Sequence, residues 1–193
     1  MKNILVLGGC GYVGSLLTPE LIKNKFKVRV IDSQWFGKNL KKNKNLNLIK
    51  KDIRNIKSSD FKNIDTVIHL ANIANDPAVD LKPELSWEVN VLSTKKICDF
   101  AIKNKVKKII YASSGSVYGV KKEKKVHENL DLVPVSVYNK TKMIAERVML
   151  SYRDKIKIIC VRPATVCGFS KRMRLDVSVN MLTYQALEKK LIT

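Results

Sequence analysis

The chain has 193 residues, of which 45% are hydrophobic and 28% are charged, and its formal net charge is +20. This balance excludes an extensively disordered protein, because it supplies enough apolar side chains for the core of an α/β domain. Every apolar run is shorter than the roughly 18 residues of a membrane span, and the run from Ile4 to Leu7 is too short for a signal peptide. We therefore expect a cytoplasmic protein with no membrane partner.

Short apolar runs alternate with segments of helical period, the pattern of βα units around a parallel sheet. The runs are mostly β-branched, as expected of strands covered by helices on both faces. The predicted strands are Asn3–Leu7, Lys27–Ile31, Leu46–Ile49, Thr66–Leu70, Lys108–Ala112 and Ile156–Val161. The predicted helices are Tyr12–Asn24, Trp87–Lys103, Val137–Tyr152 and Val177–Lys189. The polar segments Leu40–Asn47 and Val120–Leu132 are predicted to be exposed loops.

Glycines follow the first predicted strand directly, in the segment Gly8-Gly9-Cys10-Gly11-Tyr12-Val13-Gly14. A glycine string between a strand and an apolar-periodic helix is typical of a dinucleotide-binding turn. One glycine permits the sharp turn, another lets the backbone approach a pyrophosphate, and the last lets the helix pack against the sheet. The free N–H groups and the positive dipole end at the start of that helix then favour the phosphates.

An acidic residue, Asp32, ends the second predicted strand, about 20 residues past the glycines. A carboxylate there accepts hydrogen bonds from the ribose hydroxyls of a dinucleotide and repels the 2′-phosphate of NADP. Arg29 lies upstream on the strand rather than just past the acid, where a clamp for that phosphate is expected. The sequence therefore predicts NAD as the cofactor.

The helix predicted over Val137–Tyr152 follows Ser136, a typical N-cap. Its predicted buried stripe consists of Ile144, Ala145, Val148, Met149 and Tyr152. Tyr138 and Lys142 are four residues apart, so they share one face of the helix. A phenol is a poor base at neutral pH, and a neighbouring ammonium lowers its pKa.

Hydroxyl side chains follow the fifth predicted strand, in Ser113-Ser114-Gly115-Ser116. Ligands of open α/β sheets bind at the carboxyl ends of the strands. A Ser in this segment is therefore placed to hydrogen-bond the alcohol or carbonyl oxygen of a substrate.

Together these motifs resemble the extended short-chain dehydrogenase/reductases, in particular the NAD-dependent epimerase/dehydratase group typified by UDP-glucose 4-epimerase. The resemblance extends over nearly the whole chain, and its motifs are GGCGYVG, Asp32, Asp52-Ile53, His69-Leu70-Ala71, Asn90-Val91, SSGSVYG, YNKTK and Arg162-Pro163. It implies a Rossmann-type, doubly wound parallel sheet with helices on both faces. It also implies a homodimer formed through the helices Trp87–Lys103 and Val137–Tyr152.

The resemblance also implies roles for individual residues. Tyr138 would be the catalytic base and acid, Lys142 would bind the nicotinamide ribose and tune Tyr138, and Ser114 would hold the reacting oxygen. The residues implied to bind the cofactor are Gly8, Gly11, Tyr12, Val13, Gly14, Asp32, Asp52, Ile53, Leu70, Ala71, Asn90, Tyr138, Lys142 and Pro163.

Two departures narrow the implied function. Sugar-nucleotide dehydratases of the group carry an Asp-Glu pair where this chain has Gly115 and Ser116, so dehydration is disfavoured. The favoured function is epimerisation of a nucleotide-linked sugar by reversible hydride transfer. The alternatives are an NAD-dependent dehydrogenase or reductase of a sugar or small alcohol, and a non-catalytic dinucleotide-binding module.

Length is the second departure. Residues 1–170 are expected to form the NAD-binding domain, and residues 171–193 the start of a truncated C-terminal substrate lobe. Arg172, Arg174 and Asn180 would begin the substrate-facing surface of that lobe.

The high positive charge raises the possibility of a nucleic-acid partner. Thirty of the 37 basic residues are Lys, however, and they are spread along the chain without a nucleic-acid recognition motif. Because planar recognition of phosphates and bases favours Arg, we expect a solvated surface and no nucleic acid. Attraction of an acidic ligand such as a nucleotide diphosphate stays open. The four cysteines and two histidines lack metal-ligand spacing, so no metal is expected.

Overall fold

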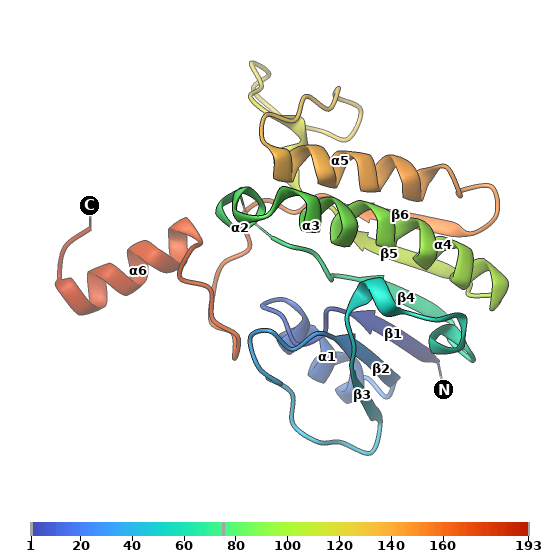
Figure 1. Ribbon diagram of the computed structural model, residues 1–193. Helices are drawn as coiled ribbons and strands as arrows, with labels where there is room; N and C mark the ends of the chain where they lie inside the picture. Colours follow the sequence, from blue (N-terminus) through green and yellow to red (C-terminus); the bar gives the residue numbers. More distant parts are fainter. Residues whose placement is uncertain (1, 75, 193) are drawn as a thin grey trace.

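The computed structural model describes residues 2–74 and 76–192. Six strands form one parallel sheet in the order β3-β2-β1-β4-β5-β6 (Figure 1). Their bounds are β1 Asn3–Leu7, β2 Lys27–Asp32, β3 Leu46–Lys50, β4 Thr66–His69, β5 Lys108–Ala112 and β6 Lys157–Val161. The predicted doubly wound α/β fold is confirmed, with every strand boundary within one residue of the prediction.

The two faces of the sheet pack against different helices. Leu5 and Leu7 of β1 belong to the larger core cluster, which lies under α4 (Ser93–Lys103) and α5 (Val137–Leu150). Ile4 and Val6 belong to a smaller cluster on the side of α1 (Gly14–Lys23). The alternation follows from the two-residue period of a strand, and Figure 1 shows α1 alone on its side of the sheet.

The edge strand β6 departs from the predicted burial. β6 alternates between exposed and half-buried side chains, and its Ile159 and Val161 are 37% and 46% exposed. One face of β6 is therefore open, whereas the half-buried apolar residues of β3 pack against both core clusters. The loop predicted over Leu40–Asn47 ends earlier than expected, because Leu46 and Asn47 are the first residues of β3.

The helices differ from the prediction mainly at their ends. α1 begins at Gly14 rather than Tyr12, because the residues before it complete the glycine turn. The helix predicted from Trp87 starts earlier, as α3 (Pro83–Trp87), and continues through a π-helical segment, Glu88–Leu92, into α4. α2 (Asp76–Leu81) was not predicted from the sequence. α6 (Ser178–Lys189) lies close to its predicted range and projects away from the sheet (Figure 1).

α5 confirms the predicted cap but only part of the predicted stripe. The side chain of Ser136 accepts a hydrogen bond from the N–H of Asn139 at 3.2 Å. Ala145 and Met149 are fully buried, whereas the other three predicted stripe residues are only half-buried. Polar side chains take the remaining deeply buried positions of this helix; they are Thr141, Lys142 and Glu146.

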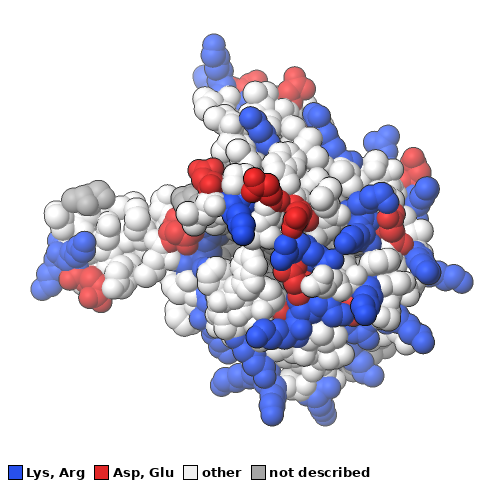
Figure 2. Space-filling view, viewed as in Figure 1, with Lys and Arg blue, Asp and Glu red and all other residues white. Residues whose placement is uncertain are grey.

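Within the described residues, no helix combines the length and the apolar character needed to cross a membrane. The same part of the chain contains no cluster of His, Cys, Asp and Glu side chains that is suited to a metal ion. Figure 2 shows Lys and Arg side chains scattered across the visible face and densest along its lower edge, with fewer acidic side chains between them.

Strand order reverses between β1 and β4, since the chain runs outward from β1 to β3 on one side and from β4 to β6 on the other. In open α/β sheets the carboxyl ends of the strands at such a reversal are where ligands bind. This edge therefore carries the candidate site.

Candidate functional site

The glycine turn lies at the carboxyl end of β1. Gly8 has a φ of +86°, and a Cβ on it would lie 2.6 Å from the backbone nitrogen of Ala71. A Cβ on Gly14 would lie 2.5 Å from the carbonyl oxygen of Gly8. A Cβ on Gly11, by contrast, would meet no atom beyond its chain neighbours closer than 3.5 Å. The turn is thus tightly packed beneath Gly8 and Gly14 and open at Gly11, as the approach of a pyrophosphate requires.

Backbone donors remain available at this opening. The N–H groups of Ser15 and Leu17 bond to carbonyls of the turn at 2.9 and 3.0 Å. For the N–H groups of Tyr12 and Val13, no acceptor is found within the described part of the chain. Together with the positive end of the α1 dipole, such donors fit an anionic phosphate.

Asp32 is held beside this turn by two backbone donors. One carboxylate oxygen accepts the N–H of Cys10 at 2.9 Å and the other accepts the N–H of Gln34 at 2.6 Å. A carboxylate has about four acceptor positions, so acceptor capacity remains for ribose hydroxyls. Arg29 points elsewhere, because its guanidinium donates to the carbonyls of Asp60 and Lys62.

Four further predicted positions lie at the same edge. The backbone of Leu70 and Ala71 packs against Gly8, with the Leu70 N–H bonded to Leu7 at 2.8 Å. Asp52 follows β3 and accepts hydrogen bonds from Arg54, which lower the pKa of its carboxyl. Its neighbour Ile53 is buried in the larger core cluster. The carboxylate of Asp52 therefore also organises the loop after β3.

Tyr138 and Lys142 lie one turn apart on α5, as predicted. Lys142 is 3% exposed, and its ammonium donates to the carbonyl of Ala112, at the end of β5, at 2.7 Å. The Lys142 nitrogen lies 5.9 Å from the centre of the Tyr138 ring. Burial lowers the pKa of Lys142 to about 7. Lys142 is thus a buried basic group within reach of a half-buried tyrosine ring.

A buried polar layer lies beneath this pair. The Lys142 nitrogen is 5.0 Å from the centre of the Tyr111 ring, and that ring is 5.3 Å from the ring of His69. Burial, followed by the charge of Lys142, lowers the pKa of His69 to about 3, so His69 is neutral. Both ring nitrogens of His69 and the hydroxyl of Tyr111 lack hydrogen-bond partners in the described structure. The sequence marked His69 only as part of a motif and gave no role to Tyr111.

Ser114 belongs to a chain of hydrogen bonds that reaches α5. Its hydroxyl is 2.7 Å from that of Ser116, and the Ser116 hydroxyl donates to the side-chain oxygen of Asn139 at 2.6 Å. Asn139 is the residue after Tyr138, so these bonds place the serine loop beside the Tyr–Lys pair. The sequence did not indicate the contact between Ser116 and Asn139, which lie 23 residues apart.

Pro163 and Arg162 connect β6 to the same loop. The carbonyl of Pro163 accepts the N–H of Gly115 at 2.8 Å. Arg162 forms an ion pair with Glu146 of α5, which is 1% exposed, and also donates to the hydroxyl of Tyr118 at 2.8 Å. Glu146 was missed because a charged residue breaks the apolar pattern of the helix. Its only signal was its position one turn after Lys142.

Asn90 lies in the π-helical segment and is fully buried. Its amide group donates to the carbonyl of Ile73 and to the hydroxyl of Thr141, both at 3.1 Å. Its side-chain oxygen accepts the N–H of Ile73 at 2.8 Å. Asn90 thus fixes the segment after β4 against α5, next to the Tyr–Lys pair.

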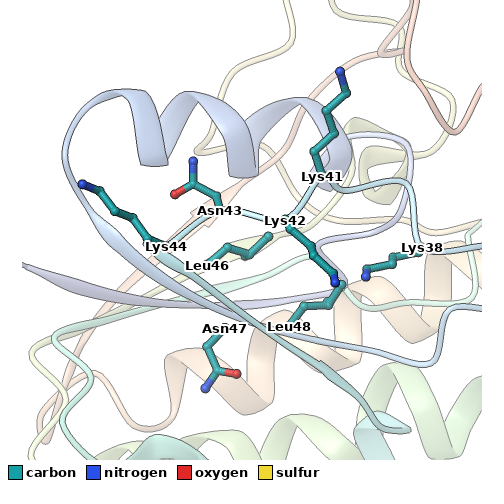
Figure 3. Close-up of a pocket in the computed structure, with 8 residues that line it drawn as sticks. All are labelled: Lys38, Lys41, Lys42, Asn43, Lys44, Leu46, Asn47 and Leu48. Atoms are coloured by element: carbon teal, nitrogen blue, oxygen red, sulfur yellow. The ribbon is translucent and has the colours of Figure 1, made fainter.

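A hollow of about 600 Å³ lies away from these residues, at the edge strand β3 (Figure 3). Its lining residues are Lys38, Lys41, Lys42, Asn43, Lys44, Leu46, Asn47 and Leu48. None of them is among the predicted site residues. Its four lysines lie in the segment before β3.

The chain is similar to proteins of known family. Residues 4–190 match the family model described as "NAD dependent epimerase/dehydratase family". A putative UDP-glucose 4-epimerase of Methanocaldococcus jannaschii is 33% identical, over 77% of this chain and 50% of that protein. The UDP-glucose 4-epimerase of Lactobacillus helveticus is 30% identical, over 87% of this chain and 53% of that protein. The chain therefore spans about half the length of these relatives.

Solved structures agree with these matches. The UDP-glucuronic acid 4-epimerase of Bacillus cereus, in complex with UDP-glucuronic acid and NAD, superposes with a TM-score of 0.85 at 31% identity. The similarity covers 99% of this chain and 65% of that structure. The whole described α/β arrangement is thus similar to the corresponding part of that enzyme.

Proposed function

Because the chain belongs to the NAD dependent epimerase/dehydratase family, we propose that it binds NAD and takes part in the epimerisation of a nucleotide-linked sugar. The observation that carries the proposal is the buried Lys142, held between Tyr138 and the end of β5. A buried ammonium beside a phenol is costly for the fold alone and useful for acid–base chemistry. The family resemblance found in the sequence is confirmed.

The proposed NAD site extends from the glycine turn to α5. The N–H groups of Tyr12 and Val13 bind the pyrophosphate, and Asp32 accepts the adenosine ribose hydroxyls. Lys142 would hold the nicotinamide ribose through its ammonium group. Bound NAD supplies a hydride acceptor that can return the hydride to the sugar. The remaining predicted contacts are Gly8, Gly11, Gly14, Asp52, Ile53, Leu70, Ala71, Asn90 and Pro163.

Side chains of the protein carry out the proton transfer. Tyr138 removes the proton of a sugar hydroxyl and later returns it, while Ser114 holds the same oxygen by a hydrogen bond. The Lys142 ammonium and the first-turn position of Tyr138 on α5 both favour the phenolate. With this assignment Tyr138 carries out both proton transfers, from one face of the sugar, as an epimerase requires.

The loop after β5 favours epimerisation over dehydration. Gly115 has no side chain, and the Ser116 hydroxyl is bonded to Asn139. Neither residue can supply the additional acid and base that loss of water needs. A dehydrogenase or reductase of a sugar or small alcohol would use the same Tyr138, Lys142 and Ser114. It would differ from an epimerase by a net oxidation or reduction of the cofactor.

We further propose that residues 1–170 form the dinucleotide-binding domain and that residues 171–193 begin a substrate-binding lobe. A homodimer through the outer faces of α4 and α5 is part of the proposal. It is supported by the exposure of Leu92, before α4, and Leu150, at the end of α5, which are 62% and 36% exposed.

The test is to incubate the chain with UDP-glucose and a small amount of NAD, and to separate the sugar nucleotides by chromatography. We expect the C4 epimer to form without accumulation of NADH. The Tyr138→Phe variant should lower the rate by about 10²–10⁴-fold and leave NAD affinity nearly unchanged. Accumulation of NADH would favour the dehydrogenase, and NAD binding without turnover of UDP-sugars would favour a binding module.

A further inference from the structure

Gly168, Ser170 and Asn180 are all hydrogen-bonded to Tyr12 of the glycine turn. The Tyr12 hydroxyl donates to the carbonyl of Gly168 at 2.6 Å and accepts a hydrogen bond from the amide of Asn180 at 3.0 Å. The Tyr12 carbonyl accepts the hydroxyl of Ser170 at 2.8 Å. Both the side chain and the backbone of Tyr12 thus hold a segment more than 150 residues away in the chain.

The contacts form a closed network. Asn180 accepts the N–H of Gly168 at 2.9 Å and donates to the carbonyl of Arg174 at 2.9 Å. The hydroxyls of Ser15 and Ser170 are 2.8 Å apart. Loss of the Tyr12 hydroxyl would therefore leave a buried Asn180 donor without one of its acceptors, which is costly for a buried polar group.

Two polar side chains of residues 168–180 are more deeply buried than the apolar ones. Asn180 is 4% exposed and Ser170 is 1% exposed. The apolar side chains around them face solvent instead, with Phe169 80% exposed and Tyr184 47% exposed. Because little apolar surface fixes residues 168–180, the Tyr12 network supplies most of their attachment to the domain.

Tyr12 also belongs to the turn proposed to bind the pyrophosphate. It lies between Gly11 and Val13, before the first residue of α1, and its N–H is one of the available donors. A ligand on this turn restricts the same backbone that the segment needs in a fixed position. Ligand binding and docking of residues 168–180 both require an ordered turn. Because either one orders it, the entropy cost of the other falls, and each favours the other.

We propose that Tyr12 is a positioning residue that couples dinucleotide binding on the glycine turn to the docking of residues 168–180. The inference rests on the proposed NAD site. Docking places Arg172 with its guanidinium 3.9 Å from the centre of the Phe36 ring, beside the loop that follows Asp32. The dinucleotide and the docked segment thus stabilise each other, and the substrate-facing surface begins at this segment.

The first test needs no ligand. Hydrogen–deuterium exchange read by mass spectrometry should show about tenfold faster exchange of the Gly168 amide, which donates to Asn180, in Tyr12→Phe than in the wild type, because each kcal/mol of lost docking raises exchange about fivefold. Exchange of β5 should not change. Tyr184→Phe, which alters an exposed tyrosine of α6, is the matched control and should match the wild type. Wild-type exchange of the Gly168 amide in Tyr12→Phe would overturn the inference.

The second test adds NAD. Saturating NAD should slow exchange of the Gly168 amide in the wild type. Tyr12→Phe and Asn180→Ala should each weaken NAD binding about fivefold, at the lower end of typical coupling strengths, and the double variant should be no weaker than either one. Asn180 is outside the turn, so its effect separates coupling from a lost direct contact. Wild-type NAD affinity in Asn180→Ala would overturn the coupling alone. Failure of the wild type to bind NAD would overturn the proposed function as well.

Discussion

The site has two halves that are built by different means. At the glycine turn the chemistry is carried by the backbone, through N–H groups and the absence of side chains at Gly8, Gly11 and Gly14. At the end of β5 and on α5 it is carried by buried side chains, with Lys142 3% and Glu146 1% exposed. A backbone site depends on local conformation, whereas a buried polar site depends on partners from distant segments. The two halves should therefore fail in different ways when single residues are changed.

The largest stability effect is expected in the side-chain half. Glu146→Ala removes the partner of the partly buried Arg162, and breaking such a pair costs about 3–5 kcal/mol in free energy of unfolding. Urea denaturation followed by circular dichroism measures this loss. Glu20→Ala, which removes one side of the exposed Glu20–Lys23 pair on α1, is the matched control and should change stability little. Equal losses of unfolding free energy in the two variants would contradict a larger contribution from the buried pair.

A smaller effect is expected in the backbone half. Gly14→Ala places a Cβ 2.5 Å from the carbonyl oxygen of Gly8, and such overpacking costs about 1–3 kcal/mol. Gly11→Ala should leave the free energy of unfolding nearly unchanged, because its Cβ meets no contact closer than 3.5 Å. The same denaturation experiment compares them. A destabilised Gly11→Ala would show that the turn is closed at Gly11 as well.

Low pH should destabilise the side-chain half of the site through His69. Its pKa is lowered to about 3 from an ordinary value of 6.5, so between these pH values the unfolded chain binds a proton that the folded chain does not. Stability from this group is therefore present above pH 6.5 and is lost as pH falls toward 3. His69→Phe should lose this part of the acid sensitivity, while His127→Phe, at an exposed position, should keep it. Identical pH profiles of the two variants would contradict the assignment.

The sequence predicted the backbone half more completely than the side-chain half. Strand positions and the glycine turn follow from local patterns, namely apolar runs and a glycine string between a strand and a helix. The Tyr138–Lys142 pair was also found, because helical spacing is local. The start of α1 was placed two residues early, since helical periodicity does not distinguish a turn from the first turn of a helix.

The contacts that the sequence missed all join distant segments. Glu146 and Arg162 are 16 residues apart, and neither residue type indicates burial. The π-helical segment that carries Asn90 has no local signature, and its bonds to Ile73 and Thr141 depend on how three segments meet. The edge strand β6 was misjudged in the same way, because the exposure of its apolar Ile159 and Val161 depends on strand order and not on residue type.

The most direct test of the whole account is calorimetric titration of NAD into the wild type and into Gly11→Ala. We expect the wild type to bind NAD. Gly11→Ala should bind it at least about tenfold more weakly, a loss of about 1.4 kcal/mol, because the added methyl group occupies the approach of the pyrophosphate. Its thermal midpoint should equal that of the wild type. Absence of binding to the wild type, or equal affinity of the two proteins, would contradict the placement of the dinucleotide on the glycine turn.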